Sequence, residues 1–204
     1  LKLRPGISIA SGTGSVAFGM DGLGNSGRAG GWSVRLGDEG SAYWITKEAI
    51  NIFFRQADGR LHKTLLYNHF MRKFELSDPL HFPMAMEECL GSSISGIAAF
   101  QREVLILYQL GDPVVKHLYE RAAGELASLA AALMDRLSFS PGQPVDVSYS
   151  GGLFKAGDCI LLPFQKEIGA LGARLVQPAY GPLVGAVCYA AKGKLKRDAL
   201  DAMF

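Results

Sequence analysis

The chain has 204 residues, of which 49 % are hydrophobic and 20 % charged, and its formal net charge is +2. This composition is ordinary for a globular protein with a substantial core, and the length suits one large domain. The near-neutral charge gives no sign of an electrostatic partner such as nucleic acid or a lipid surface. The basic cluster at 192–197 is interpreted as a solvated tail.

Cysteine usage and hydropathy bear on the compartment. Cys89, Cys159 and Cys188 are odd in number and lack a C-x-x-C spacing, which argues against a disulfide scaffold or a zinc site. No apolar run approaches the roughly 20 residues that span a bilayer. No signal peptide is recognised either. We therefore expect a cytoplasmic protein without a membrane partner.

The most informative segment is Ser11 to Ser41, which contains ten glycines and few bulky side chains. Such a run buries little apolar surface, and each glycine costs conformational entropy on folding. Glycines also let backbone N–H groups approach a ligand closely. The segment is therefore predicted to form the floor of a binding site for something small and polar.

Three short strands are expected in the first forty residues, at 7–10, 16–19 and 32–36. A Ser-Gly-Thr-Gly-Ser turn separates the first two, and Asp21-Gly22 is a hairpin signal after the second. The third segment alternates apolar and polar residues. This pattern predicts three antiparallel strands joined by tight turns.

One glycine pattern in this segment imitates another kind of site. Gly12, Gly14 and Ala17 satisfy the G-x-G-x-x-A fingerprint of dinucleotide-binding folds, which requires a helix to begin at the glycines. Gly19 and the Asp-Gly pair that follows would break such a helix. We instead expect a hairpin turn whose successive amides form an anion-binding nest.

Helical periodicity dominates the middle of the chain. Helices are expected from residue 42 to Asp58-Gly59, across 61–74, at 84–90, across 94–108, and from Asp112-Pro113 to about 137. Asp and Pro at the start of the last helix suit a cap and a first turn. Trp32 and Trp44 are interpreted as packing residues, and none of the histidines as a catalyst.

Two strand-to-helix units are expected after the helical block. Strands at 145–149 and 174–177 are followed by a helix at about 158–171 and by a final helix that contains Gly185. Parallel strands need such crossover connections. The predicted fold class is therefore α/β, with the ribonuclease H-like layout of three antiparallel strands, a helical insertion at about 60–140 and two strand–helix units.

Four motifs in this order carry a resemblance to a known family. They are Ser11–Ser15 (SGTGS), Gly30-Gly31-Trp32 with Gly37–Trp44 (GDEGSAYW), Ser150-Gly151-Gly152, and the closing segment Gly181–Ala190. Together they resemble the C-terminal lobe of an N-acetylglucosamine kinase-type protein of the BadF/BadG/BcrA/BcrD family. That family belongs to the superfamily of actin-like ATPases and sugar kinases.

The resemblance implies a role for each motif. The phosphates of ATP would be held by Ser11, Gly12, Thr13, Gly14 and Ser15, and the adenosine by Ser150, Gly151, Gly152, Leu153 and Phe154. The sugar would be bound by Gly30, Gly31 and Asp38, while Gly181, Gly185 and Ala186 would belong to a connecting helix that permits lobe closure. An alternative for Asp38 is that it only caps the helix that begins near Ser41.

The implied reaction is the ATP-dependent phosphorylation of N-acetylglucosamine or glucosamine, with Mg²⁺ as the metal. The family's first phosphate loop and its catalytic Asp are not found in this sequence, and neither is a metal ligand. The chain is therefore expected to be one lobe of a two-lobed kinase, with an N-terminal lobe as its partner. The helices of the central block are candidates for a homodimer interface.

Two other functions stay open at this level. One is an ATPase activator of a dehydratase or reductase from the same superfamily, although the cysteine spacing does not match an iron–sulfur site. The other is a catalytically silent regulator that binds a sugar or a nucleotide. The catalytic Asp, which this sequence does not include, would distinguish the kinase from the regulator.

Overall fold

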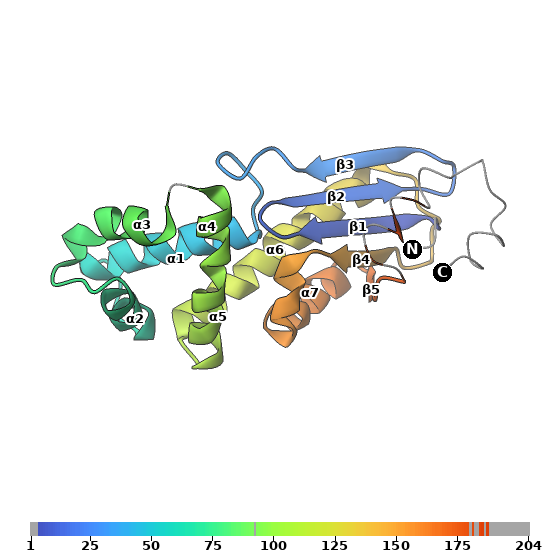
Figure 1. Cartoon of the computed structure of the whole chain (residues 1–204). Helices are drawn as coiled ribbons and strands as arrows, with labels where there is room; N and C mark the ends of the chain where they lie inside the picture. Colours follow the sequence, from blue (N-terminus) through green and yellow to red (C-terminus); the bar gives the residue numbers. More distant parts are fainter. Residues whose placement is uncertain (1–3, 92, 180, 182–183, 186, 188–204) are drawn as a thin grey trace.

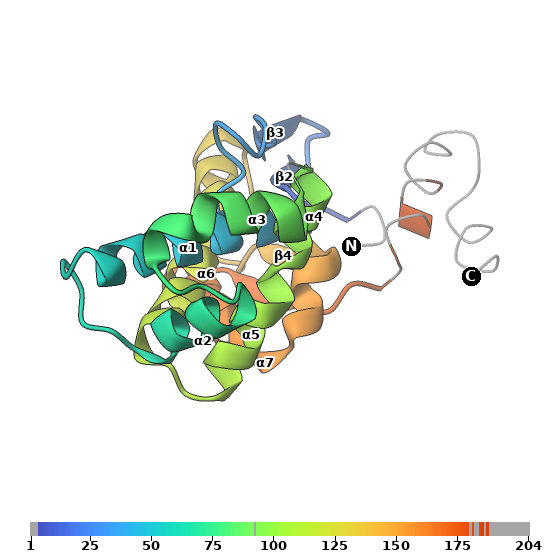
Figure 2. The same ribbon diagram turned by 60° about the vertical axis from the view of Figure 1, so that its left-hand side comes forward.

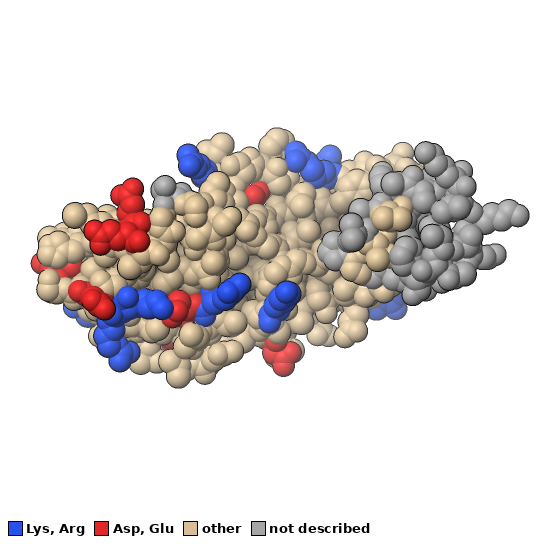
Figure 3. All heavy atoms as spheres, in the orientation of Figure 1, with Lys and Arg blue, Asp and Glu red and all other residues tan. Residues whose placement is uncertain are grey.

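A five-stranded sheet and a block of helices lie end to end in the molecule (Figure 1). The computed structural model describes residues 4–91, 93–179, 181, 184–185 and 187. Among these residues, no helix combines the length and the apolar character that a membrane span requires. Figure 3 shows basic and acidic side chains intermingled over the helical end on the face in view.

The sheet contains both antiparallel and parallel pairs. Its strands are β1 (Gly6–Ser11), β2 (Ser15–Met20), β3 (Ser26–Gly30), β4 (Asp146–Ser150) and β5 (Arg174–Val176). They lie in the order β3-β2-β1-β4-β5. The first three strands pair antiparallel, whereas β4 is parallel to both β1 and β5. The predicted α/β layout is confirmed, except that most of the segment predicted as the final helix lies outside the described residues.

The third strand lies earlier in the chain than predicted. It spans Ser26–Gly30, and 32–36 forms bends and turns instead of a strand. Asp21 closes a short turn that starts the strand: its Oδ1 accepts from the amide of Asn25 at 2.8 Å, and its Oδ2 from the Asn25 side-chain amide at 2.9 Å. These bonds, the side-chain one foremost, hold the pKa of Asp21 below its usual value.

Small residues in β3 are explained by the helix beneath it. A Cβ atom at Gly27 would lie 3.3 Å from the Leu133 side chain, and one at Gly30 would lie 3.1 Å from the Leu129 side chain. The strand Ser-Gly-Arg-Ala-Gly therefore lacks the β-branched residues by which strands are usually recognised in sequence. The alternating pattern at 32–36 indicated a strand more strongly than residues 26–30 did, but that prediction was wrong.

The helices follow the predicted order. They are α1 (Ala42–Ala57), α2 (Leu65–Lys73), the short η1 (Pro79–His81), α3 (Phe82–Leu90), α4 (Ile94–Ala99), α5 (Gln101–Gln109), α6 (Pro113–Arg136), η2 (Gly152–Ala156) and α7 (Asp158–Ala170). The single helix predicted across 94–108 is divided at Phe100. That ring is buried between Phe70 and Phe74, with a centroid distance of 5.4 Å to each.

One face of the sheet packs on α6 and α7. Helix α6 contacts β1, β2 and β3 as well as α7, and α7 contacts β5. The strand residues on this side, among them Ile7, Ile9 and Val147, are fully buried. Helices α1 to α5 extend from the end of the sheet in Figure 1, and they lie in front of it after the 60° turn of Figure 2. The helical block and the sheet share α6, although α6 lies within the range predicted as an insertion.

Asp112 joins two helices at the centre of the block. The residue is fully buried, and its carboxylate accepts from the amides of Val114 (3.0 Å) and Val115 (3.2 Å) at the start of α6. Its second oxygen accepts from the amide of Leu66 at the start of α2, at 2.8 Å. The cap predicted at Asp112-Pro113 is thus confirmed and extends to a second helix.

Replacing Asp112 with alanine should lower the free energy of unfolding by about 2 kcal/mol, because three amides, two of them in buried hydrogen bonds, lose their acceptor. Asp112→Asn should lose less, since its amide oxygen can still accept. Urea unfolding followed by circular dichroism measures both. Equal stability of the wild type and Asp112→Ala would contradict this role.

Candidate functional site

Three glycine-rich segments meet where β1 and β4 end. These are the hairpin turn 12–14 between β1 and β2, the loop 31–41 that leads into α1, and the turn 151–152 after β4. Because β1 and β4 are parallel, their carboxyl ends lie at the same edge of the sheet, which is where open α/β sheets usually bind ligands. The fold therefore assembles at one edge the segments that the sequence placed far apart.

On the β4 side, the hairpin turn lies against the turn after β4. Gly151 has a φ of +104°, and a Cβ atom there would lie 2.2 Å from the carbonyl oxygen of Ser11. A Cβ atom at Gly12 would lie 3.6 Å from the amide nitrogen of Gly152. Only a residue without a side chain fits at Gly151, so the predicted phosphate and adenosine segments touch through their backbones.

On the β3 side, the same hairpin contacts the loop that leads into α1. The amide of Ala42 donates to the carbonyl oxygen of Gly12 at 2.8 Å. The hydroxyl of Ser11 donates to the carbonyl of Gly40 at 3.2 Å, and that of Ser15 to the carbonyl of Glu39 at 2.7 Å. Both serines are buried and only Thr13 of the segment exposes its side chain. The two serine hydroxyls are thus occupied by the protein itself.

Asp38 lies beside the tip of the hairpin. Its backbone has a φ of +53°, which is uncommon for a residue other than glycine, and the residue is only 8 % exposed. Its Oδ1 accepts from the amide of Ser33 at 3.3 Å. A Cβ atom at Gly14 would lie 2.3 Å from its Oδ2, so the carboxylate rests directly on that glycine.

The alternative that Asp38 only caps the helix is wrong. The residue that caps α1 is Ser41, whose hydroxyl accepts from the amide of Trp44 at 3.2 Å. The carboxylate of Asp38 is not used by the helix and lies at the hairpin instead.

Gly30 and Gly31 end β3 and turn the chain toward Asp38. Both have positive φ, +72° and +70°, and the amide of Gly31 donates to the carbonyl of Ser15 at 2.9 Å. Trp32 follows, and its interpretation as a packing residue is wrong because it is 72 % exposed. The guanidinium of Arg28 lies 4.8 Å from the Trp32 ring centroid. Trp44 is buried as predicted.

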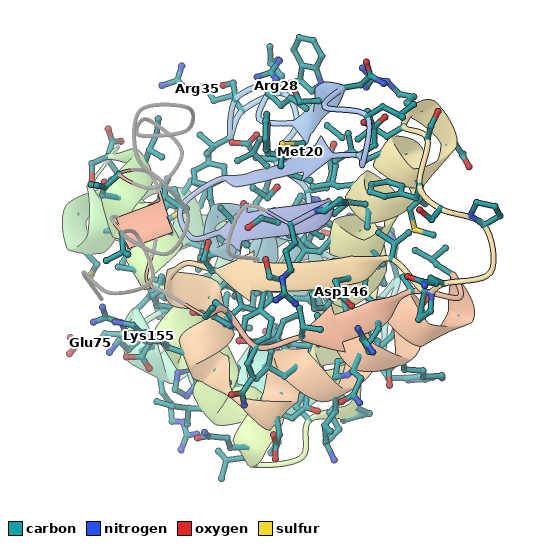
Figure 4. All side chains as sticks on the ribbon, turned by 90° about the vertical axis from the view of Figure 1, so that its right-hand side faces the viewer. Met20, Arg28, Arg35, Glu75, Asp146 and Lys155 are labelled. Carbon is teal, nitrogen blue, oxygen red and sulfur yellow. The ribbon has the colours of Figure 1, made fainter. Side chains whose placement is uncertain are left out.

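A cavity of about 400 Å³ opens next to the turn after β4. It is lined by Tyr149, Ser150, Gly151, Phe154, Lys155, Pro178, Ala179 and Gly181. Tyr149 and Lys155 were not predicted, although each directly flanks the predicted segment 150–154. Figure 4 shows Lys155 beyond β4, with Arg28 and Arg35 at the opposite, β3 edge of the sheet.

The remaining predicted residues lie around this cavity or in the core. Leu153 belongs to the hydrophobic core and is 1 % exposed, while Phe154 packs between Tyr149 and Phe164 and also borders the cavity. The amide of Gly185 donates to the carbonyl of Gly181 at 3.0 Å. Ala186 lies outside the described residues.

The fold and this edge define a class of protein. A sheet in the order β3-β2-β1-β4-β5, with glycine turns after β1 and β4, is the ribonuclease H-like lobe that was predicted for actin-like ATPases and sugar kinases. A candidate N-acetylglucosamine kinase from Chromobacterium violaceum has a similar crystal structure, with a TM-score of 0.69 and 26 % identity over 90 % of this chain and 59 % of that one.

The chain belongs to the BadF/BadG/BcrA/BcrD ATPase family, which residues 2–190 match. An N-acetylmuramic acid/N-acetylglucosamine kinase of Clostridium acetobutylicum is 31 % identical over 81 % of this chain and 54 % of its own length. An N-acetyl-D-glucosamine kinase of Dictyostelium discoideum is 25 % identical over 93 % of this chain and 60 % of its own. The chain thus spans little more than half the length of these relatives.

Proposed function

We propose that this chain supplies the nucleotide site and part of the sugar site of an ATP-dependent amino-sugar kinase. The observation that carries the proposal is the order of the three segments at the sheet edge. The hairpin turn lies between the cavity after β4 on one side and the carboxylate of Asp38 on the other. A kinase needs this order, because the transferred phosphoryl group must lie between the nucleoside and the acceptor hydroxyl.

In this proposal, the adenosine enters the cavity of about 400 Å³ beside Ser150 and Gly151. The phosphates extend over the hairpin turn 12–14, held by backbone amides and by the exposed hydroxyl of Thr13. Lys155 borders the cavity and adds a positive charge near the nucleotide. ATP therefore suits the residues present on the β4 side.

Mg²⁺ is expected to arrive with the nucleotide. Within the described residues, no group of three His, Cys, Asp or Glu side chains is placed to hold a metal ion. Mg²⁺ in phosphoryl-transfer sites commonly binds one or two carboxylates together with the phosphates of the substrate. When bound, the ion would neutralise charge that develops on the phosphates, and the residues described here would orient those phosphates.

The sugar is proposed to bind at Asp38 and the Gly30-Gly31 turn. A carboxylate can accept hydrogen bonds from two neighbouring hydroxyl groups of a hexose, and Asp38 presents its carboxylate next to the hairpin that would carry the phosphates. The two curated relatives are named as kinases of N-acetylated amino sugars. We therefore propose an N-acetyl amino sugar as the substrate.

Two parts of the machinery are proposed to lie in another lobe. The general base that accepts the proton of the attacking hydroxyl, and the first phosphate loop, are not among the residues described here. This chain corresponds to 54 % and 60 % of its two relatives. We propose that it is the C-terminal lobe, that residues of an N-terminal lobe complete the site, and that the helices at about 60–140 are an insertion in this lobe, whose last helix, α6, also packs on the sheet.

A coupled ADP-release assay tests this function. The full-length protein that contains this chain would be given ATP, Mg²⁺ and a panel of hexoses and amino sugars, alongside an Asp38→Ala variant. Losing hydrogen bonds from a carboxylate is worth about 3 kcal/mol, so kcat/KM should fall about a hundredfold. Asp135→Ala, at an exposed position on α6, is the control that should keep its activity.

No turnover of any sugar by the wild-type protein would overturn the kinase proposal. ATP hydrolysis without sugar would then favour the ATPase activator, and binding without turnover would favour the regulator. Turnover that Asp38→Ala leaves unchanged would keep the kinase and remove Asp38 from the sugar site.

A further inference from the structure

The hairpin 11–15 and the loop 38–42 are joined by contacts that no ligand is needed to explain. Two buried hydroxyls of the hairpin donate to successive carbonyls of the loop, Ser15 to Glu39 at 2.7 Å and Ser11 to Gly40 at 3.2 Å. The amide of Ala42 returns a third bond, to Gly12 at 2.8 Å. These three bonds hold the strand-end turn against residues 39–42.

The loop needs such support because its own backbone is unfavourable. Asp38 has a φ of +53° and Gly40 a φ of +73°. A non-glycine residue in this region costs free energy and persists only when its surroundings determine its conformation. A Cβ atom at Gly40 would lie 2.6 Å from the carbonyl oxygen of Ala122 on α6, so the loop is also pressed against that helix.

The resemblance of Ser11–Ser15 to a phosphate loop suggests that the serines bind phosphate. Their hydroxyls instead donate to the carbonyls of Gly40 and Glu39. We propose that Ser11 and Ser15 are positioning residues whose hydrogen bonds to Glu39 and Gly40 form a clip between the Asp38 loop and the hairpin. The clip would keep a fixed distance between the Asp38 carboxylate, which is proposed to bind the sugar, and the backbone amides, which are proposed to bind phosphate. This inference rests on the proposed kinase function for its kinetic consequences. The clip itself is a property of the fold and can be tested without turnover.

If the clip exists, removing it should change the KM for the amino sugar much more than the KM for ATP. In Ser15→Ala the hairpin amides stay in the sheet, whereas Asp38 loses support for its strained conformation. The KM for the amino sugar should therefore rise about tenfold, the effect of losing one hydrogen bond, while the KM for ATP changes less than twofold. Thr13→Val should instead raise the KM for ATP more than the KM for the amino sugar, because Thr13 carries the exposed hydroxyl of the turn.

The experiment combines hydrogen exchange with steady-state kinetics on the full-length protein that contains this chain. In Ser15→Ala, backbone amides of residues 38–42 should exchange faster than in the wild type, with unchanged exchange in α6. The matched control is Ser128→Ala, which removes an equally short bond, 2.7 Å to the carbonyl of Glu125, from the surface of α6. It should change neither the loop nor either KM.

The outcomes separate the clip from the kinase. Unchanged exchange at 38–42 in Ser15→Ala and in the Ser11→Ala/Ser15→Ala double variant would overturn the clip, whether or not the protein phosphorylates a sugar. Equal rises in both KM values would also overturn it, because that result describes general loosening of the site. A wild type without sugar turnover would refute the proposed function, and faster exchange at 38–42 would still support the clip.

Discussion

Replacing Gly151 with alanine should weaken binding of an adenine nucleotide by about a hundredfold or more. The backbone at Gly151 has a φ of +104°, and a Cβ atom would lie 2.2 Å from the carbonyl oxygen of Ser11. The contact joins two strand ends, so no flexible side chain can move aside. Backbone strain of this kind costs about 1–3 kcal/mol before the clash is counted, and 3 kcal/mol corresponds to a factor of more than one hundred.

The measurement is calorimetric titration of the full-length protein with a non-hydrolysable ATP analogue. Gly142→Ala is the matched control, because Gly142 has a similar φ of +80° but no atom within 4 Å of the added methyl group. The Gly142→Ala variant has the backbone strain of a positive φ but no steric clash, and residue 142 precedes β4 and does not line the cavity. Equal nucleotide affinities of Gly151→Ala and the wild type would show that the turn after β4 does not contact the nucleotide.

The largest effect on stability is expected for Phe53→Ala. Phe53 lies on α1, is fully buried, and has ring centroids of other aromatic residues 5.0 to 5.9 Å away, those of Phe54, Tyr67, Phe70 and Phe82. Removing a buried phenyl ring loses its transfer free energy and leaves a cavity. The free energy of unfolding should fall by about 4 kcal/mol.

Thermal and denaturant unfolding, followed by circular dichroism, would measure this loss. Phe53→Leu should lose less because it refills part of the volume, and Leu80→Ala should change little because Leu80 is 83 % exposed. Since α1 begins directly after the Asp38 loop, a destabilised α1 should also reduce sugar binding at temperatures near the transition. A loss below about 1 kcal/mol for Phe53→Ala would mean that the aromatic cluster tolerates a cavity there.

Both predictions follow from the fact that the candidate site and the most stabilising side chains lie in different parts of the chain. The site edge is built from backbone, with glycines where strands and loops touch, and it has few side chains to contribute to stability. The aromatic residues that stabilise the helical block are concentrated between Phe53 and Phe100, away from that edge. Helix α1 connects the two parts, because its cap residue Ser41 lies in the site and its last turns carry Phe53 and Phe54.

Much of the fold could be predicted from local sequence. The helix starts near Ser41 and at Asp112, the hairpin turn at Asp21 and the β-prone run at 7–10 are short-range signals, and all are confirmed. The glycines of the site were also recognisable, because each marks a backbone that another residue would disturb. Fold class and family follow from signals of this kind.

Tertiary contacts decided the rest. The third strand is at 26–30 because α6 passes closely beneath it and selects small residues, information that lies a hundred residues away in the chain. The serine hydroxyls turn toward Glu39 and Gly40 because that loop is brought to the hairpin. Tyr149 and Lys155 line a cavity because Pro178, Ala179 and Gly181 lie beside them. Local periodicity indicates which secondary structure each segment prefers. The direction of a side chain, in contrast, depends on which distant segment packs beside it.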